Sequence, residues 1–195
     1  MSIVAADSIS SFFGEVVEDA KKARGVDASQ TVTAYIVGVL ADYAHPNQSL
    51  EPLGRPLALS LQEALVTFEP AERFERLRQL GDAVLYASGF FADHFAARGL
   101  ETRYVSTIGA RAYVSAGAML RSQQSTLFDE LAHRFDELTQ VLSEVADRTL
   151  AQQNAKDSRG LLKMYERWLK TGSDAMAEAL VENGIFPTRG AKGVQ

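Results

Sequence analysis

The sequence predicts an all-α protein, a compact multi-helix bundle of about seven to eight helices with no β-sheet. Apolar residues recur at spacings of three and four along nearly the whole chain, which is the period of an amphipathic helix. No convincing run of alternating apolar and polar residues bounded by hairpin turns is present. With 195 residues, 46% of them hydrophobic and 23% charged, the chain is long enough and apolar enough to bury a core of its own.

The helix boundaries follow from capping and stop signals. Gly25 ends the first apolar stripe, and Ser29 is a good N-cap for the second helix. Residues 46–57 hold three of the five prolines and are expected to form a loop. Pro70 suits the first position of a helix. The expected helices cover about residues 8–24, 29–44, 59–68, 70–98, 101–121, 125–151, 157–170 and 173–183.

The chain is expected to form one helical domain over residues 1–186. Residues 187–195 are glycine-rich and carry no capping signal, so we expect a flexible C-terminal tail. No internal repeat of the length used by solenoid proteins is present, which favours a bundle.

Composition excludes several functional classes. With a net charge of −5 the chain has no generally basic surface that could bind phosphate groups, so nucleic acid is not an expected partner. The start of the chain lacks the features of a secretory signal, and no stretch is apolar for long enough to span a membrane, so a cytoplasmic location without membrane association is expected. The absence of cysteine excludes thiol catalysis and thiolate metal sites. The motifs of phosphate-binding loops and zinc hydrolases are missing as well, so we expect no cofactor, and the sequence favours a non-enzymatic protein over an enzyme.

The helix expected at 125–151 carries an apolar seam with alternating spacings of three and four, formed by Phe128, Leu131, Phe135, Leu138, Leu142 and Val145. The seam could pair with a helix of the same chain or with its copy in a homodimer; the first is favoured, because three heptads are marginal for an independent coiled coil. Glu130 and His133 have the spacing of a metal-binding Glu-x-x-His motif. Both fall on the face opposite the seam, so we expect no metal there.

Residues 83–98 are apolar almost all round the helix, and we expect this segment to be central and buried. It nevertheless carries Tyr86, Asp93 and His94, which would need polar partners if buried. The next helix supplies candidates in Tyr104, Arg111 and Tyr113, on a stretch rich in small residues.

Two interpretations of these six residues stay open. The favoured one is a structural network that fixes how the two helices pack. The other is a pocket between residues 83–98 and 101–121 for a small anionic or aromatic ligand, with His94 and Arg111 as donors. A haem held by His94 is a special case of the second interpretation.

Three stretches, residues 35–44, 80–91 and 165–173, together resemble a group of uncharacterised bacterial all-helical proteins of about this length. Tyr104, Gly109 and Tyr113 after the second stretch, and residues 184–187 after the third, extend the resemblance. It implies a bacterial, cytoplasmic protein and carries no activity or ligand with it.

The sequence therefore predicts a non-enzymatic interaction or regulatory protein that forms a homodimer through an apolar helix face. The alternative is a helical protein, with or without enzymatic activity, that binds a small ligand or a cofactor such as haem at the pocket described above.

Overall fold

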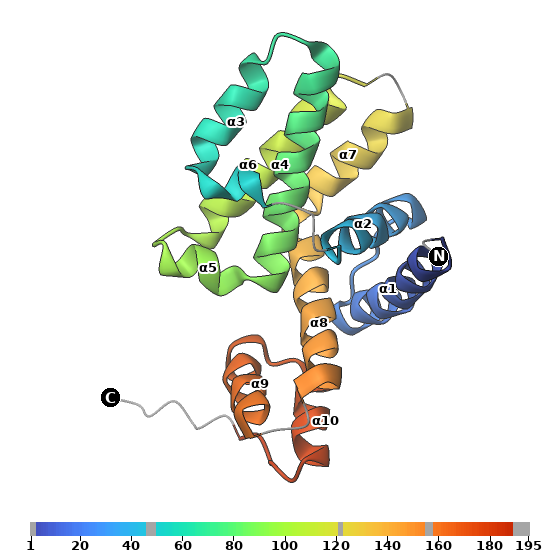
Figure 1. The fold of residues 1–195 in the computed structure, drawn as a ribbon, viewed down its shortest axis with the longest axis vertical. Coiled ribbons are helices and arrows are strands. Elements are labelled where there is room, and N and C mark those ends of the chain that lie inside the picture. Colours follow the sequence, from blue (N-terminus) through green and yellow to red (C-terminus); the bar gives the residue numbers. More distant parts are fainter. Residues whose placement is uncertain (1–2, 46–49, 121–122, 155–157, 189–195) are drawn as a thin grey trace. The chain divides into compact units, whose positions relative to one another are not determined.

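The computed structural model describes residues 3–45, 50–120, 123–154 and 158–188, and every regular element among them is a helix (Figure 1). The all-α prediction is confirmed. The elements are α1 (Ile3–Arg24), α2 (Gln30–Tyr43), the 3-10 helix η1 (Glu51–Gly54), α3 (Leu57–Val66), α4 (Pro70–Phe90), α5 (Ala92–Ala97), α6 (Thr102–Gly117), α7 (Gln123–His133), α8 (Phe135–Asn154), α9 (Ser158–Thr171) and α10 (Asp174–Glu182).

The chain divides into two compact units, residues 1–142 (unit 1) and residues 143–195 (unit 2), with the boundary inside α8. Each unit is described separately below. Of the predicted flexible tail, residues 189–195 lie outside the described part of the chain.

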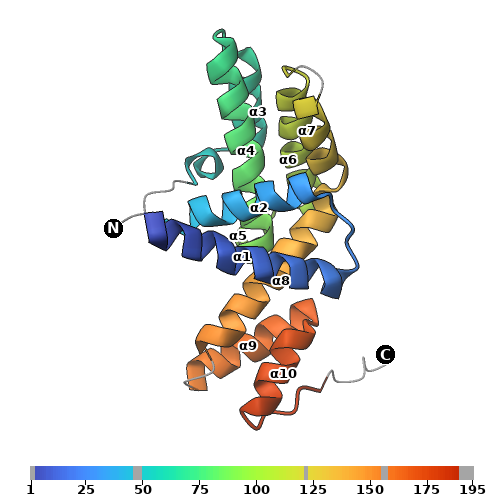
Figure 2. The same cartoon turned by 90° about the vertical axis from the view of Figure 1, so that its right-hand side faces the viewer.

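Unit 1 is organised around α4 and α6, which pack against each other. Helix α7 packs on α6, and α3 packs on both α4 and α6. Helices α1 and α2 form a second pair that runs across the direction of α4, with α2 in contact with α4 and α7 (Figure 2). The buried face of α4 supplies the centre of the core, where Leu77, Leu80 and Leu85 are fully buried.

The predicted helix signals are present at the ends of several helices. The Ser29 side chain caps α2 by accepting a hydrogen bond from the backbone N–H of Val32. Pro70 occupies the first turn of α4, where a missing N–H costs nothing. Gly25 and Gly99 end their helices in the left-handed region, with φ of 64° and 69°. These boundaries follow from local chemistry, which is why the sequence predicts them.

Ten α-helices are found among the described residues, so the predicted count of seven to eight is slightly low. Two expected helices are each divided in two. The helix expected at 70–98 ends at Phe90, because Phe91 leaves the helical region with φ −132° and ψ 40°, and α5 then starts in a new direction. A turn at Arg134 separates α7 from α8 in the helix expected at 125–151, although Arg134 still takes part in helical backbone hydrogen bonds on both sides.

The apolar seam of α7 and α8 is buried along its whole length, in agreement with the bundle-core interpretation. The Phe128 ring contacts the rings of Tyr35, Phe74 and Tyr113 from three other helices. On the opposite side, the Glu130 carboxylate accepts a hydrogen bond of 2.8 Å from the backbone N–H of Ser29. Glu130 thus ties α7 to the start of α2.

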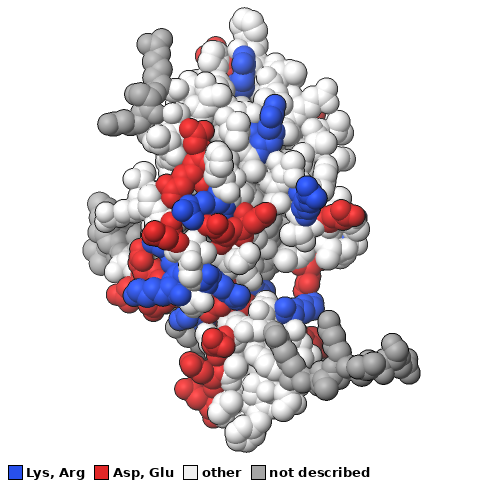
Figure 3. All heavy atoms as spheres, turned by 180° about the vertical axis from the view of Figure 1, so that it is seen from behind, with Lys and Arg blue, Asp and Glu red and all other residues white. Residues whose placement is uncertain are grey.

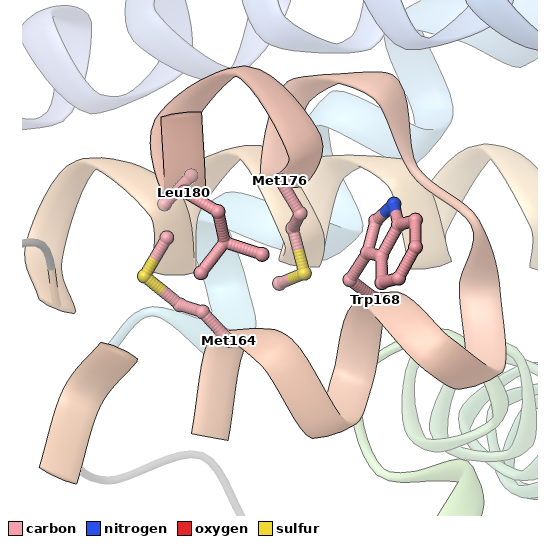
Figure 4. Packing of buried hydrophobic residues seen from close by; sticks show 5 residues of the cluster. Met164, Trp168, Met176 and Leu180 are labelled. Atoms are coloured by element: carbon pink, nitrogen blue, oxygen red, sulfur yellow. The ribbon is translucent and has the colours of Figure 1, made fainter. Parts of the chain in front are cut away.

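Unit 2 contains the end of α8 together with α9 and α10. Met164 and Trp168 of α9 pack against Met176 and Leu180 of α10, and the four side chains point toward one another (Figure 4). Asp147 of α8 is fully buried and pairs with Arg167 of α9. Burial raises the pKa of the Asp147 carboxyl, and the Arg167 guanidinium opposes that change.

Candidate functional site

The six residues singled out in the sequence do not form one site. Tyr113 is fully buried and Tyr86 is half-buried, whereas the other four, Asp93, His94, Tyr104 and Arg111, are exposed. The prediction that residues 83–98 form one buried helix is wrong beyond Phe90. After the break at Phe91, five of the six residues of α5 are exposed and only Phe95 is buried.

The buried acid among the described residues of unit 1 is Asp82, which directly precedes the segment that the sequence singles out. Its Oδ1 accepts hydrogen bonds of 2.8 Å from the hydroxyls of Tyr35 and of Tyr113. Its Oδ2 accepts a hydrogen bond of 2.7 Å from Arg78, one turn earlier on α4. Arg78 also pairs with Glu75 at 2.6 Å. Asp82 therefore joins α2, α4 and α6.

Asp82 is a buried acid whose negative charge is only partly balanced by its hydrogen-bond partners. Burial raises the pKa of Asp82 to about 6, while Arg78 and the two tyrosine hydroxyls oppose the increase. Burial and the neighbouring Asp82 carboxylate also raise the pKa of Tyr113 well above its ordinary value. Both tyrosines thus stay protonated and act as donors, which is the role of structural residues.

The Tyr113 ring is held against the backbone of α4 at Gly81. A Cβ at position 81 would lie 2.6 Å from Cε1 of that ring, so only glycine lets the two helices approach this closely. A helix-interior glycine beside an acid in an apolar run is a signal that could have identified Asp82 from the sequence. Neither of the two cavities described next is lined by Asp82, which agrees with a structural role.

A pocket of about 390 Å³ lies where α5 meets η1 and the end of α4. Its apolar lining comes from Leu50, Leu53, Ala87 and Phe91, and its polar lining from His94 and Arg98. Of the six residues predicted from the sequence, only His94 lines this pocket. The predicted position between residues 83–98 and 101–121 therefore differs from the observed one, because η1 supplies the second wall in place of α6.

A second cavity, of about 580 Å³, lies between η1, α3 and α4. Its arginines already have partners: Arg55 pairs with Glu63 and Arg76 pairs with Glu72, each at 2.7 Å. An anionic ligand in this cavity would have to displace a carboxylate, so it is the weaker candidate for a binding site.

The sequence matches no protein-family model, and comparison with curated proteins and with solved structures found no match. The arguments below therefore rest on the geometry of this chain.

Two further observations describe the surface. On the face shown in Figure 3, acidic side chains lie beside the basic ones. Within the described ranges, no group of three or more His, Asp or Glu side chains is placed to hold a metal ion, and no helix is long and apolar enough to cross a membrane.

Proposed function

We propose that the protein is a non-enzymatic interaction protein that acts as a homodimer, and that the dimer forms through the exposed apolar face of α3. The seam of α7 and α8, the first candidate for this contact, lies in the core and is not free to pair with a second copy. Another apolar helix face is needed for the association.

The observation that supports α3 is a cluster of exposed apolar side chains. Of the twelve large apolar residues found exposed in the described part of the chain, four lie within ten consecutive positions: Leu59 (50%), Leu65 (40%), Val66 (73%) and Phe68 (93%). We call these four residues the α3 strip, although Phe68 follows the end of α3 by two residues. Leu59 and Val66 are two turns apart and share the outer side of the helix, whereas Leu65 lies on its flank, about 100° round the axis from Val66. A concentration of this kind marks an interaction surface, whereas scattered single apolar residues do not.

The other side of α3 is already used. Leu57, Leu61 and Ala64 are buried in unit 1, where α3 packs on α4 and α6. Figure 1 shows α3 at the edge of unit 1, with no other described helix of that unit on the side away from α4. The helix is therefore apolar on two opposite sides, and only one of them has a partner within unit 1.

A second copy of the chain is the occupant that suits this strip. In a two-fold symmetric contact both copies use the same surface, so a face with charges of one sign would repel itself. The only charged residue in α3 is Glu63, whose carboxylate is paired with Arg55. Glu63 lies one turn from Leu59 at the border of the strip, and Arg55 balances its charge there, which limits the repulsion between two copies. Because α3 has only ten residues, the contact lies at the small end of interface sizes, and we expect a dimer that dissociates in the micromolar range.

Sedimentation velocity of the full chain over about 5–500 μM tests the proposal, since that range spans a micromolar dissociation constant. We expect the mass to rise toward twice the monomer value of 21.3 kDa for the wild type, and to stay at the monomer value for Val66→Glu and Phe68→Ser. Phe12→Ser, at an apolar residue of α1 that is 40% exposed, is the matched control and should still dimerise. A wild type that is monomeric throughout, or α3 variants that dimerise as well as the control, would overturn the proposal.

A further inference from the structure

We infer that the 390 Å³ pocket beside α5 binds a small amphiphilic anion, a molecule with an apolar body and one anionic group. The inference is independent of the α3 strip, because no residue of that strip lines the pocket. It rests on the lining of the pocket, the position of two basic side chains and the absence of an acid from the wall.

The body of the pocket is apolar. Leu53 and Ala87 are buried and form its inner part, while Phe91 is exposed at its opening. The Phe91 ring also contacts Tyr86, at 5.8 Å between ring centroids, and this contact holds it beside α4. An apolar group that enters the pocket would therefore be covered by Leu, Ala and Phe side chains, and its removal from water would drive binding.

The basic end of the pocket is formed by α5 and its last cap. His94 and Arg98 are four residues apart and so lie on the same side of this short helix. Arg98 donates a hydrogen bond of 2.9 Å from Nη1 to the backbone carbonyl of Leu53 in η1. That bond fixes the guanidinium at the wall and uses one of its five N–H donors, so the remaining donors are available to an anion.

Among the described residues, no carboxylate lines the pocket. Asp93, the neighbour of His94 in the sequence, lies on α5 but is not part of the wall. An anionic group beside Arg98 would thus meet a basic wall without a competing acid, in contrast to the larger cavity, where both arginines are paired. Charge complementarity favours an anion over a neutral or cationic ligand.

The size of the pocket limits the ligand. A volume of about 390 Å³ is near the lower end of the roughly 300–1,000 Å³ found for ligand pockets. It suits one ring or a short acyl chain rather than a nucleotide or a haem. The haem alternative is further disfavoured because His94 is exposed at the pocket and not enclosed among the phenylalanines.

Octanoate and its uncharged analogue octanamide are suitable probes, with binding followed on the full chain by two-dimensional NMR. We expect octanoate to shift the signals of Leu53, Ala87 and Phe91, and octanamide to bind about 10-fold more weakly, a difference of about 1.4 kcal/mol. Arg98→Gln should weaken the binding of octanoate to the level of octanamide, whereas Arg98→Lys, which keeps the charge, should retain part of the preference for the anion.

Arg103→Gln removes the same charge from an exposed position of α6 and is the matched control, which should bind octanoate like the wild type. His94→Gln should weaken the binding of octanoate and leave the binding of octanamide unchanged. The NMR spectrum recorded without either probe shows whether each variant is folded. The inference is overturned if octanoate shifts no signal, shifts signals only outside the pocket, or binds no better than octanamide. Equal losses of octanoate affinity in Arg98→Gln and Arg103→Gln would also overturn the inference, because such losses would reflect the net charge of the protein alone.

Discussion

Replacing Tyr113 with Phe removes a single hydroxyl from the core of unit 1 and leaves the ring in place. The ring packs against Gly81 and contacts Phe128 and Phe135 at centroid distances of 5.9 and 6.0 Å, and Phe can keep all of these contacts. What is lost is the 2.8 Å hydrogen bond to the Asp82 carboxylate. The variant therefore isolates one charge-assisted bond in a fully buried position.

A hydrogen bond to a charged group contributes about 1.5–3 kcal/mol. Asp82 keeps its bonds to Tyr35 and Arg78 in the variant, so the carboxylate is still partly compensated. We therefore expect Tyr113→Phe to lower the free energy of unfolding at neutral pH by about 2 kcal/mol, toward the lower part of that range.

Urea unfolding followed by circular dichroism measures this change, with an unchanged dependence on denaturant as the sign that the native and unfolded states are otherwise alike. Tyr104→Phe, which removes a hydroxyl from an exposed position of the same helix, should change stability by less than about 0.5 kcal/mol. If Tyr113→Phe also costs less than about 0.5 kcal/mol, the hydroxyl of Tyr113 does not stabilise the buried carboxylate and the reasoning is refuted.

Three further changes test other parts of the fold by urea unfolding. Burial raises the pKa of Asp82 from 3.8 to about 6, so the stability linked to its protonation is fully present below pH 3.8 and is lost as the pH rises to about 6. From pH 4 to 7 the stability of Asp82→Asn should therefore rise by about 2 kcal/mol relative to wild type. Parallel pH curves would contradict this. Gly109→Ala should lower the free energy of unfolding by about 1–3 kcal/mol, because the added Cβ would overlap the Phe135 ring. Gly38 has open space around it, so Gly38→Ala should raise the free energy of unfolding by about 0.5–1 kcal/mol. Equal effects of the two changes would argue against the close contact at Gly109. Asp147→Ala removes the buried carboxylate that pairs with Arg167 and should destabilise unit 2 by about 3 kcal/mol, measured by the fluorescence of the single tryptophan. An unchanged midpoint would contradict this.

The helices could be predicted from the sequence because their signals are local. Ser29, Gly25 and Pro70 act on the backbone within one turn, and the apolar periodicity of each helix depends only on its own residues. The break at Phe91 has only a weak local signal, Gly89 two residues earlier, which lowers the helix propensity there. Gly81 gives the same signal within α4, where the helix continues, so glycine alone does not predict the position of the break.

The Asp82 network could not be predicted because its members are far apart in the chain. Tyr35 comes 47 residues before Asp82 and Tyr113 comes 31 residues after it. Which tyrosine meets which acid depends on how α2, α4 and α6 pack. The pocket was missed for a related reason. The sequence identifies His94, but the opposite wall of the pocket comes from η1, which lies within the proline-rich residues 46–57, and no periodic pattern predicts the position of that segment.

The position of Phe128 at the meeting point of three helices has a consequence for synthesis on the ribosome. Tyr35, Phe74 and Tyr113 all contact a ring that is added to the chain after every one of them. At a synthesis rate of about 5–20 residues per second, Phe128 is added to the chain roughly 5–20 s after Tyr35. Until then the rings of Tyr35, Phe74 and, once it is made, Tyr113 lack their contact with Phe128. The growing chain is therefore most open to chaperones, and to aggregation, shortly before unit 1 closes.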